Sequence, residues 1–198
     1  MIHVFFAEIP DCGDDCGNYE PLPPEWEKYV CGIKDEARRR QSLYGRRLLV
    51  SALRALRIKA EEFVSDENGR WRIKDSIENV DFSLSHSGKA VAVAILTNAG
   101  GEKIGVDAEL VSDRILKLGE RIAGKGETML SAEELTRIWT QKESAYKAGA
   151  DMKSAFFATE TREICGEKYV VTVACASRKA IEKAKFYRIK DYKCIPYI

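Results

Sequence analysis

The chain has 198 residues, of which 45% are hydrophobic and 32% are charged. This balance is typical of a folded globular protein and excludes an extensively disordered chain. Its 32 basic and 31 acidic side chains give a net charge of +1, so the overall charge does not indicate a nucleic-acid partner.

Neither a signal peptide nor a membrane span is expected. Residues 1–8 lack a basic start and a long apolar core, and the longest apolar run, residues 90–96, is much shorter than the ~20 residues that cross a bilayer. We therefore expect a cytoplasmic protein whose six cysteines are reduced. Cys12 and Cys16 are too few to bind zinc, because the chain has two histidines and no second pair of spaced cysteines.

The first predicted elements are a buried strand at residues 2–9, a loop at 11–24 that is rich in Gly, Pro and Asp, and a long helix at 35–57. Asp35 is a suitable N-cap for this helix. The apolar positions that recur at helical spacing are Leu49, Ala52, Leu53 and Leu56.

The start of this helix carries the densest positive cluster of the chain: Arg38, Arg39, Arg40, Arg46 and Arg47. Such a cluster can be a solvated helix face. It can also bind phosphates or an acidic protein, because guanidinium groups pair with two oxygens at once. The helix alone does not decide between these interpretations.

Two hairpins are predicted next. Their strands span residues 62–65 and 71–74, then 80–85 and 89–97. Gly69 and Arg70 lie at the tip of the first hairpin, and His86 lies between Ser85 and Ser87 at a strand end of the second. A lone histidine between serines is commonly a turn residue, although strand ends also present ligand contacts.

A further strand is predicted at residues 103–110. Strand alternation places Asp107 and Glu109 on one side, with their carboxylates adjacent. This pair can be an exposed strand end, or it can bind a hard divalent cation that neutralises both charges. Gly105 allows another group to approach the backbone just before the pair.

The remaining elements are a helix near residues 112–122, a longer helix that begins at the capping box 131–134 and ends at Gly149, and several strands. The glycine-rich loop at 123–127 lacks the spacing of a nucleotide-binding motif. The predicted strands span residues 155–165, 168–176 and 185–190, with a last short strand ending near Tyr197.

Trp139, Glu143 and Lys147 share one face of the longer helix, because residues four apart are neighbours on a helix. They can form an ordinary surface ion pair with Trp139 as a core anchor. Alternatively, the carboxylate of Glu143 can hold a metal or accept a proton, provided that other carboxylates reach it.

The order of one strand, a long helix and antiparallel strands occurs twice. It predicts an α+β (α/β) fold of two similar halves, residues 1–99 and 100–198, related by a pseudo-twofold axis, each with a long helix on a small, mainly antiparallel sheet. A cleft between the halves would bring His86 toward Asp107, Glu109 and Glu143, and we expect the active site there.

Three motifs, residues 82–87 (FSLSHS), 105–109 (GVDAE) and 139–147 (WTQKESAYK), resemble the signature of the Sfp-like 4'-phosphopantetheinyl transferases. Their order and rough spacing agree along nearly the whole chain. The resemblance implies an enzyme that moves the phosphopantetheine arm of coenzyme A, its co-substrate, onto a serine of an apo acyl or peptidyl carrier protein. It implies Mg²⁺, with Mn²⁺ as a possible substitute, and release of adenosine 3',5'-bisphosphate.

The resemblance also implies roles for single residues. The metal-binding acids would be Asp107, Glu109 and Glu143; the catalytic residues Glu143 (the base), Lys147 and Asp107; and the coenzyme A contacts Arg40, Gly69, Arg70, Ser85, His86 and Lys147. The N-terminal half would then carry most coenzyme A contacts, and the C-terminal half would carry the acids and the catalytic helix.

The chain departs from the family pattern at Ser83, where asparagine is usual, and at Trp71, where proline is usual. Two other classes of function stay open: a metal-dependent phosphodiester hydrolase that uses the same acids, and a non-catalytic module that binds a carrier protein or coenzyme A. A chain with two such halves could complete its cleft as a monomer, without nucleic acid or a membrane as partner.

Overall fold

The computed structural model describes residues 1–10, 21–60, 62–67, 69–74, 79–124 and 130–189. Its elements are, in chain order, β1 (Ile2–Glu8), α1 (Pro24–Cys31), α2 (Glu36–Ala55), β2 (Phe63–Ser65), β3 (Trp71–Ile73), β4 (Asp81–Ser87), β5 (Ala90–Leu96), β6 (Ile104–Leu110), the 3-10 helix η1 (Asp113–Leu118), α3 (Gly119–Ala123), α4 (Ala132–Lys147), β7 (Phe156–Ile164), β8 (Glu167–Cys175), α5 (Arg178–Ile181) and β9 (Lys185–Ile189). The predicted mixture of helices and small sheets is confirmed. The predicted strand near Tyr197 lies outside the described residues.

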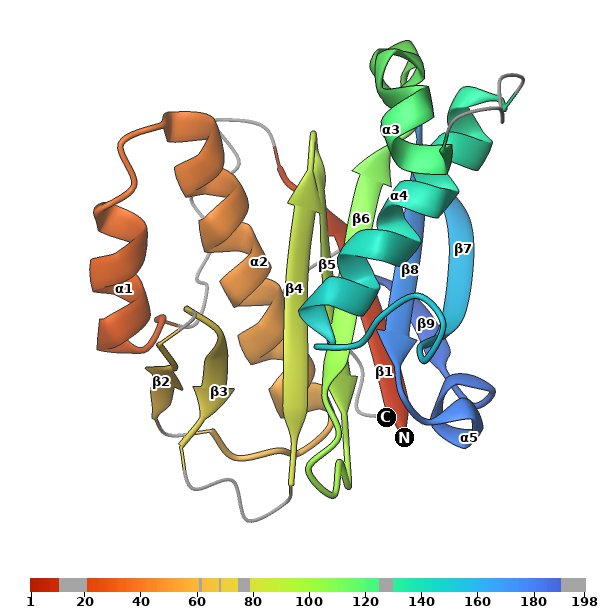
Figure 1. Ribbon diagram of the computed structural model, residues 1–198. Coiled ribbons are helices and arrows are strands. Elements are labelled where there is room, and N and C mark those ends of the chain that lie inside the picture. The colour runs from red at the N-terminus through yellow and green to blue at the C-terminus, as the bar shows by residue number, and fades with distance from the viewer. Residues whose placement is uncertain (11–20, 61, 68, 75–78, 125–129, 190–198) are drawn as a thin grey trace.

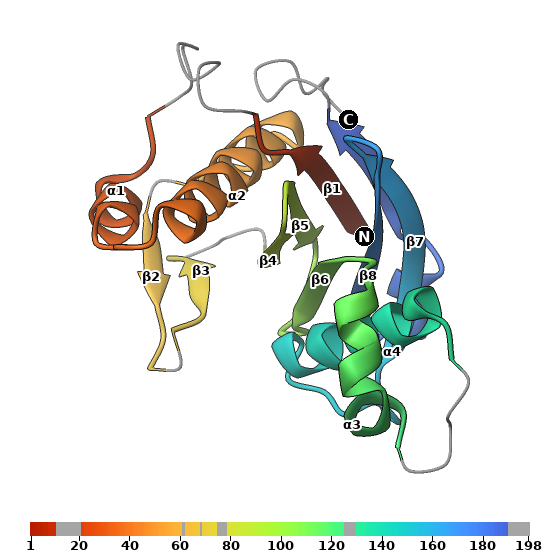
Figure 2. The ribbon, with the colours of Figure 1, turned by 90° about the horizontal axis from the view of Figure 1, so that it is seen from above.

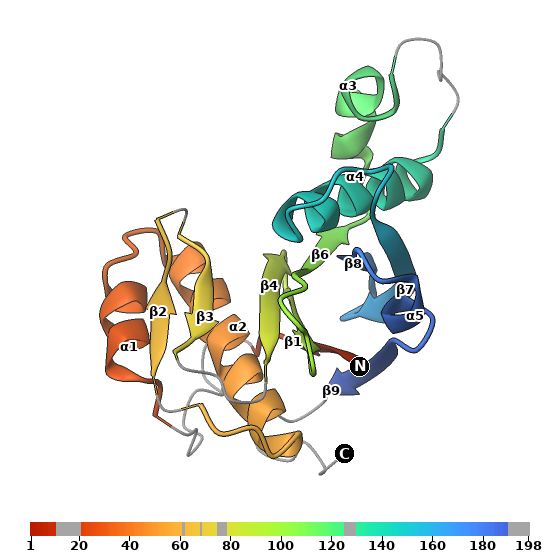
Figure 3. The same ribbon diagram turned by 60° about the horizontal axis from the view of Figure 1, so that its bottom comes forward.

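The strands form one four-stranded sheet in the order β4-β5-β1-β9, one three-stranded sheet in the order β6-β8-β7, and the hairpin β2-β3. Neighbouring strands are antiparallel except β1 and β9, which are parallel. The two larger sheets lie next to each other, with α2 outside the first and α4 outside the second (Figure 2). The strands of both sheets surround a shared interior (Figure 3).

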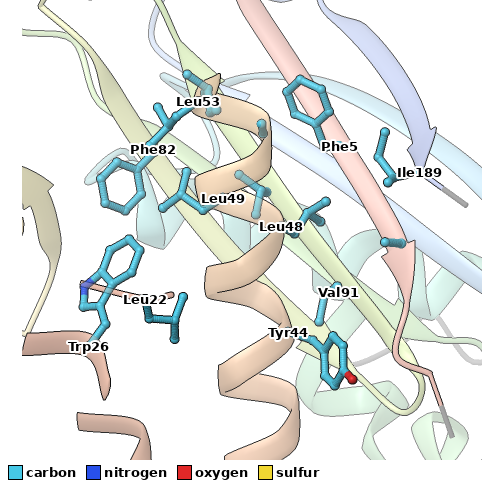
Figure 4. Close-up of a cluster of buried hydrophobic side chains, with 14 of the residues drawn as sticks. Phe5, Leu22, Trp26, Tyr44, Leu48, Leu49, Leu53, Phe82, Val91 and Ile189 are labelled. Atoms are coloured by element: carbon cyan, nitrogen blue, oxygen red, sulfur yellow. The ribbon is translucent and has the colours of Figure 1, made fainter. Parts of the chain in front are cut away.

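The first hydrophobic core lies between α2 and the four-stranded sheet (Figure 4). Leu48, Leu49 and Leu53 of α2 are at most 2% exposed, because they recur at the spacing that puts them on one helix face. Alternate residues of β5 face them: Val91, Val93 and Ile95. Burial of these apolar side chains is the main force that holds α2 on the sheet.

The second core lies between the two larger sheets. The other face of β5, which carries Ala90, Ala92 and Ala94, belongs to it, together with apolar residues of β6 and β8. A strand buried on both faces reads as a continuous apolar run, and this explains why the run at residues 90–96 is unbroken. The two sheets are therefore held together by an interior that neither could form alone.

The helix ends confirm three predictions. The side chain of Asp35 accepts a hydrogen bond from the amide of Arg38 at the start of α2. Ser131 and Glu134 form the predicted capping box of α4, and Gly149 follows the end of α4 with a φ of +68°. A positive φ favours glycine, so Gly149 stops the helix.

Other elements differ from the sequence predictions. The helices α1 and α5 were not expected, and the helix predicted near residues 112–122 is a 3-10 turn followed by the short α3. In addition, β9 pairs with β1, so a strand from the second predicted half completes the sheet of the first. The pseudo-twofold relation and the domain division after residue 99 stay predictions.

Two further features bear on location and chemistry. Among the residues that the structure describes, no helix is long and apolar enough to cross a bilayer. Cys31 and Cys175 are free thiols, whereas Cys12 and Cys16 lie outside the described residues.

Candidate active site

The strands β4 and β6 are edge strands of the two larger sheets, and they run side by side in the same direction (Figure 1). Polar side chains join them. Alternate residues of β4 accept hydrogen bonds from amides of β6: Asp81 from Ile104 at 2.7 Å, Ser83 from Val106 at 3.1 Å and Ser87 from Leu110 at 3.3 Å. We call this polar row of β4, Asp81, Ser83, Ser85 and Ser87, the seam.

Lys147 reaches the seam from the last turn of α4. Its Nζ donates to Oδ1 of Asp107 at 2.6 Å, and to Oγ of Ser85 and the carbonyl oxygen of Val106 at 3.1 Å each. Ser85 in turn donates to the same Oδ1 at 2.8 Å. The side chains of Lys147 and Asp107 are 27% and 6% exposed. Because this ion pair is largely shielded from water, its attraction is stronger than that of a surface pair.

The second carboxylate oxygen of Asp107, Oδ2, is buried and has no hydrogen-bond partner. Leaving such an acceptor unsatisfied costs about 1–3 kcal/mol, and more when it is charged. A hard divalent cation would satisfy it, because Mg²⁺ prefers carboxylate oxygens and completes its coordination with water and substrate oxygens. The orphaned oxygen therefore fits a cation beside Asp107.

Glu109 lies two residues after Asp107 on the same face of β6, as predicted. Ser87 donates to its carboxylate at 2.6 Å. Burial raises the pKa of Glu109 and the charge of Asp107 raises it further, while hydrogen bonds from Ser87 and Trp139 lower it. Trp139 is half-buried, and its indole donates toward this carboxylate, so the ring borders the site; its role as a core anchor stays a prediction.

Glu143 lies on α4 one turn after Trp139 and one turn before Lys147, on the same helix face. It is half-buried. Within the described part of the chain, no three His, Cys, Asp or Glu side chains form a group that could hold a metal. The structure thus brings Asp107 and Glu109 together, and it leaves Glu143 outside a closed set of ligands.

His86 lies beside the seam, with positive charges around it. Its ring reaches solvent, yet desolvation by the surrounding protein lowers its pKa, and the charges of Lys147, Arg38 and Arg46 lower it further. The positive charges of Lys147, Arg38 and Arg46 therefore act together on this end of β4.

The arginines of α2 do not form a uniformly solvated face. Arg46 is 8% exposed, and its guanidinium lies 4.4 Å from the ring centre of Tyr29, 5.6 Å from Trp26 and 5.9 Å from Trp71. Its Nε is buried without a partner. Arg40, predicted to contact coenzyme A, is half-buried nearer the start of the same helix.

A pocket of about 470 Å³ opens next to the seam. This volume lies within the range of small-molecule sites, roughly 300–1,000 Å³. It brings together three of the residues predicted from the sequence: Gly69, Arg70 and Lys147. Tyr146, which is 81% exposed, also lines it.

Sequence reasoning missed Asp81, Ser83 and Ser87 as site residues, together with the contact of Trp139. A signal was present, because polar residues occupy every second position of residues 81–87. In a strand, such alternation puts all of them on one face. Their partners on β6 could not be read from the sequence, since the two strands belong to different sheets.

Comparison of the chain with models of known protein families gives no match, and comparison with curated proteins gives none either. The function must therefore be inferred from the chemistry of the site. Two desolvated carboxylates, a shielded lysine, a histidine among cations and an adjacent pocket are its main features.

Proposed function

We propose that the protein is a 4'-phosphopantetheinyl transferase that uses Mg²⁺, or Mn²⁺ in its place. It would move the phosphopantetheine arm of coenzyme A to a serine hydroxyl of an apo acyl or peptidyl carrier protein. The observation that carries this proposal is the Lys147–Asp107 pair at the seam, with Glu109 beside it and a pocket at Lys147. The three motifs that resemble the family all meet at this pair.

Cationic groups would bind the anionic parts of coenzyme A. Lys147 borders the pocket, and it would neutralise the negative charge that grows on the phosphoryl oxygens during transfer. His86, with Arg38 and Arg46 near enough to lower its pKa, would contact another phosphate. Ser85 holds Lys147 through its Oγ and thereby orients it.

The acids would hold the metal ion. Asp107 through its orphaned Oδ2 and Glu109 would be ligands, and Glu143 would join them from α4. When bound, Mg²⁺ neutralises charge on the pyrophosphate and so favours its cleavage.

Glu143 would also act as the base. Its carboxylate would accept the proton of the carrier serine hydroxyl as the serine oxygen forms a bond to the phosphorus that bears the pantetheine arm. The bond from that phosphorus to the bridging oxygen breaks, and adenosine 3',5'-bisphosphate leaves with the electron pair. A helix face places Glu143 one turn from Lys147, so base and phosphate-binding cation would act on neighbouring atoms.

The carrier protein would approach the basic side of the site. Acyl carrier proteins are acidic, and exposed arginines such as Arg38 and Arg39 lie at the start of α2. Opposite charges on the two partners would steer their encounter and raise the association rate. The same charges make that rate sensitive to salt.

The test is incubation of the protein with coenzyme A, Mg²⁺ and an apo carrier protein, followed by mass spectrometry of the carrier. We expect the carrier serine to gain one phosphopantetheine. Cleavage of coenzyme A without any gain on several carriers would instead identify a phosphodiester hydrolase. Binding of coenzyme A with neither product would identify a non-catalytic module.

Glu143→Gln is the sharpest variant for this assay, because glutamine keeps the shape of the side chain and cannot accept the proton. Loss of a general base lowers rates by about 10²- to 10⁴-fold. The matched control is Glu163→Gln on β7, which changes an exposed glutamate and should leave transfer intact. Wild-type rates from Glu143→Gln would remove Glu143 from the mechanism.

A further inference from the structure

Arg70 stands at a hairpin tip that is fixed by hydrogen bonds. The amide of Arg70 donates to the side chain of Asp66 at 2.9 Å, and the amide of Asp66 donates to the carbonyl of Arg70 at 2.9 Å. Gly69, with a φ of +76°, takes the backbone shape that this turn needs. The hairpin therefore presents the side chain of Arg70 in one direction.

The guanidinium of Arg70 contacts three other elements. Its Nη2 lies 2.5 Å from the carboxylate of Asp81 on β4 and 2.8 Å from the carbonyl oxygen of Ile104 on β6. Its Nη1 donates to the carbonyl oxygen of Lys147 at the end of α4. The side chain is 22% exposed. Only a planar group with several fixed donors can serve these acceptors together, so lysine would not replace it.

These contacts fix the position of the backbone at Lys147, and hence the point from which its side chain extends. The last carbonyl groups of a helix have no partner within the helix, and a cation that donates to them also complements the helix dipole. Lys147 is thus held at both ends, by Arg70 at its carbonyl and by Asp107 at its Nζ.

The last turn of α4 packs against Gly105 of β6 with no room for a side chain between them. A Cβ atom on Gly105 would lie 1.9 Å from the carbonyl oxygen of Ser144 and 2.7 Å from the amide nitrogen of Ala148. The last turn of α4 therefore rests directly on the backbone of β6, and Arg70 closes its end. A small displacement of this turn would move Lys147 by a similar distance, because Lys147 is the last residue of α4.

We propose that Arg70 is a positioning residue: it fixes the C-terminal turn of α4 so that Lys147 stays on Asp107, and it acts on the reaction through Lys147. This inference rests on the proposed transferase function for its effect on rate. It differs from a direct contact between Arg70 and coenzyme A, because both terminal nitrogens of Arg70 already donate to protein groups on β4, β6 and α4.

The kinetic test compares Arg70→Lys with the control Arg72→Lys, which changes an exposed arginine two residues along the chain. Misplacement of a catalytic group by about 1 Å can cost 10²-fold in rate. We expect kcat of Arg70→Lys to fall by about this factor, with a much smaller rise in KM for coenzyme A, because Lys147 is also one of the proposed phosphate contacts. A raised KM with unchanged kcat would show that Arg70 binds coenzyme A itself, and would overturn the proposal.

A second readout does not depend on transferase activity. Brief treatment with an amine-acylating reagent, followed by mass spectrometry, measures how accessible Lys147 is relative to the exposed Lys153. We expect Arg70→Lys to raise labelling of Lys147 several-fold and Arg72→Lys to leave it unchanged. Unchanged labelling in a folded Arg70→Lys variant contradicts the positioning role even if the protein transfers nothing.

Asp81→Asn provides a milder variant should Arg70→Lys fail to fold. It keeps the shape of an acceptor for Arg70 and for the amide of Ile104 but removes the charge. We expect a smaller increase in Lys147 labelling, with circular dichroism unchanged. No increase in this variant would mean that the Asp81–Arg70 pair does not hold Lys147, and the proposal would fall.

Discussion

The two long helices lie on their sheets in different ways. The contact of α2 consists of large apolar side chains, among them Leu48 and Leu49. The contact of α4 consists mostly of small or polar ones: Thr136, Thr140, Ser144 and Ala145 are all at most 1% exposed. One helix is held by apolar area, the other by close approach and hydrogen bonds.

The packing of α2 thus mainly stabilises the fold, whereas the packing of α4 mainly positions the side chains of the site. Large side chains keep α2 at a distance from its sheet but bury much apolar surface, which stabilises the fold. Small side chains bring the backbone of α4 onto β6 at Gly105. Because the helix lies so close to β6, the side chains of Lys147 and Trp139 reach the carboxylates of Asp107 and Glu109.

Leu49→Ala should give the largest loss of stability. Leu49 is fully buried between α2 and the sheet, and truncation of such a leucine costs about 2–5 kcal/mol. Urea unfolding followed by circular dichroism measures the free energy of unfolding. The matched control is Leu116→Ala, because Leu116 is 47% exposed and its truncation should cost less than about 0.5 kcal/mol. Equal losses would contradict the argument that apolar burial holds α2 on its sheet.

Gly105→Ala should lower the free energy of unfolding less than Leu49→Ala does, but it should reduce transfer activity more. The added methyl group meets backbone atoms of α4, so the helix must shift, at a cost of about 1–3 kcal/mol. Transfer should be lost because Lys147 moves with the helix. Gly45→Ala on α2 is the control, since its Cβ would meet one methyl group of Leu84 at 3.6 Å and should stabilise the helix by about 0.5–1 kcal/mol. Full activity of Gly105→Ala would refute the close-approach argument.

Thr140→Val should have a smaller effect. Its Oγ1 bonds with Oγ1 of Thr172 at 2.8 Å, and Thr172 also bonds with Thr159 at 3.0 Å, which links α4 to β8 and β7. Valine keeps the shape and removes the hydrogen bond to Thr172 together with the one that Oγ1 donates to the carbonyl oxygen of Arg137 at 3.0 Å, a loss of about 1 kcal/mol for each. In a double-mutant cycle with Thr172→Val, the combined loss should be less than the sum. Strict additivity would mean that the two hydroxyls do not stabilise each other.

The pH dependence contributed by the histidines should be the smallest effect. Desolvation lowers the pKa of His3, as do the N-terminus and Lys185, and desolvation with nearby cations lowers that of His86. Below a pH of about 6.5, the unfolded chain binds protons that the folded chain does not. Stability should therefore fall as the pH drops through this window, and His86→Gln should flatten the decline measured by urea unfolding at pH 7.5 and 5.5. An unchanged slope would show that His86 is not responsible.

Much of the secondary structure could be predicted from local signals. Asp35, the capping box at Ser131 and Gly149 mark helix ends, and the unbroken apolar run of β5 marks a strand buried on both faces. The adjacency of Asp107 and Glu109 followed from strand alternation alone. Each of these depends on residues close together in the chain.

What could not be predicted depends on distant partners. The carboxylate of Asp107 meets Lys147 from another element, and the burial of Arg46 under Trp26 and Tyr29 requires the short helix α1, which was itself missed. A proline at its start and the pair Trp26 and Val30, four residues apart, were available signals for α1. Arg70 resembled a ligand contact in the sequence, and its contacts with Asp81, Ile104 and Lys147 emerge only when the sheets are placed.

The parallel pairing of β9 with β1 has a consequence for synthesis on the ribosome. His3 pairs with Lys185, so the N-terminal strand emerges long before its neighbour on that edge has been translated. Until then, β1 is an open edge with unpaired amide and carbonyl groups, the kind of surface on which other chains can add strands. Closing so long a loop is also slow. This edge of β1 therefore stays open throughout the interval in which the second sheet is made.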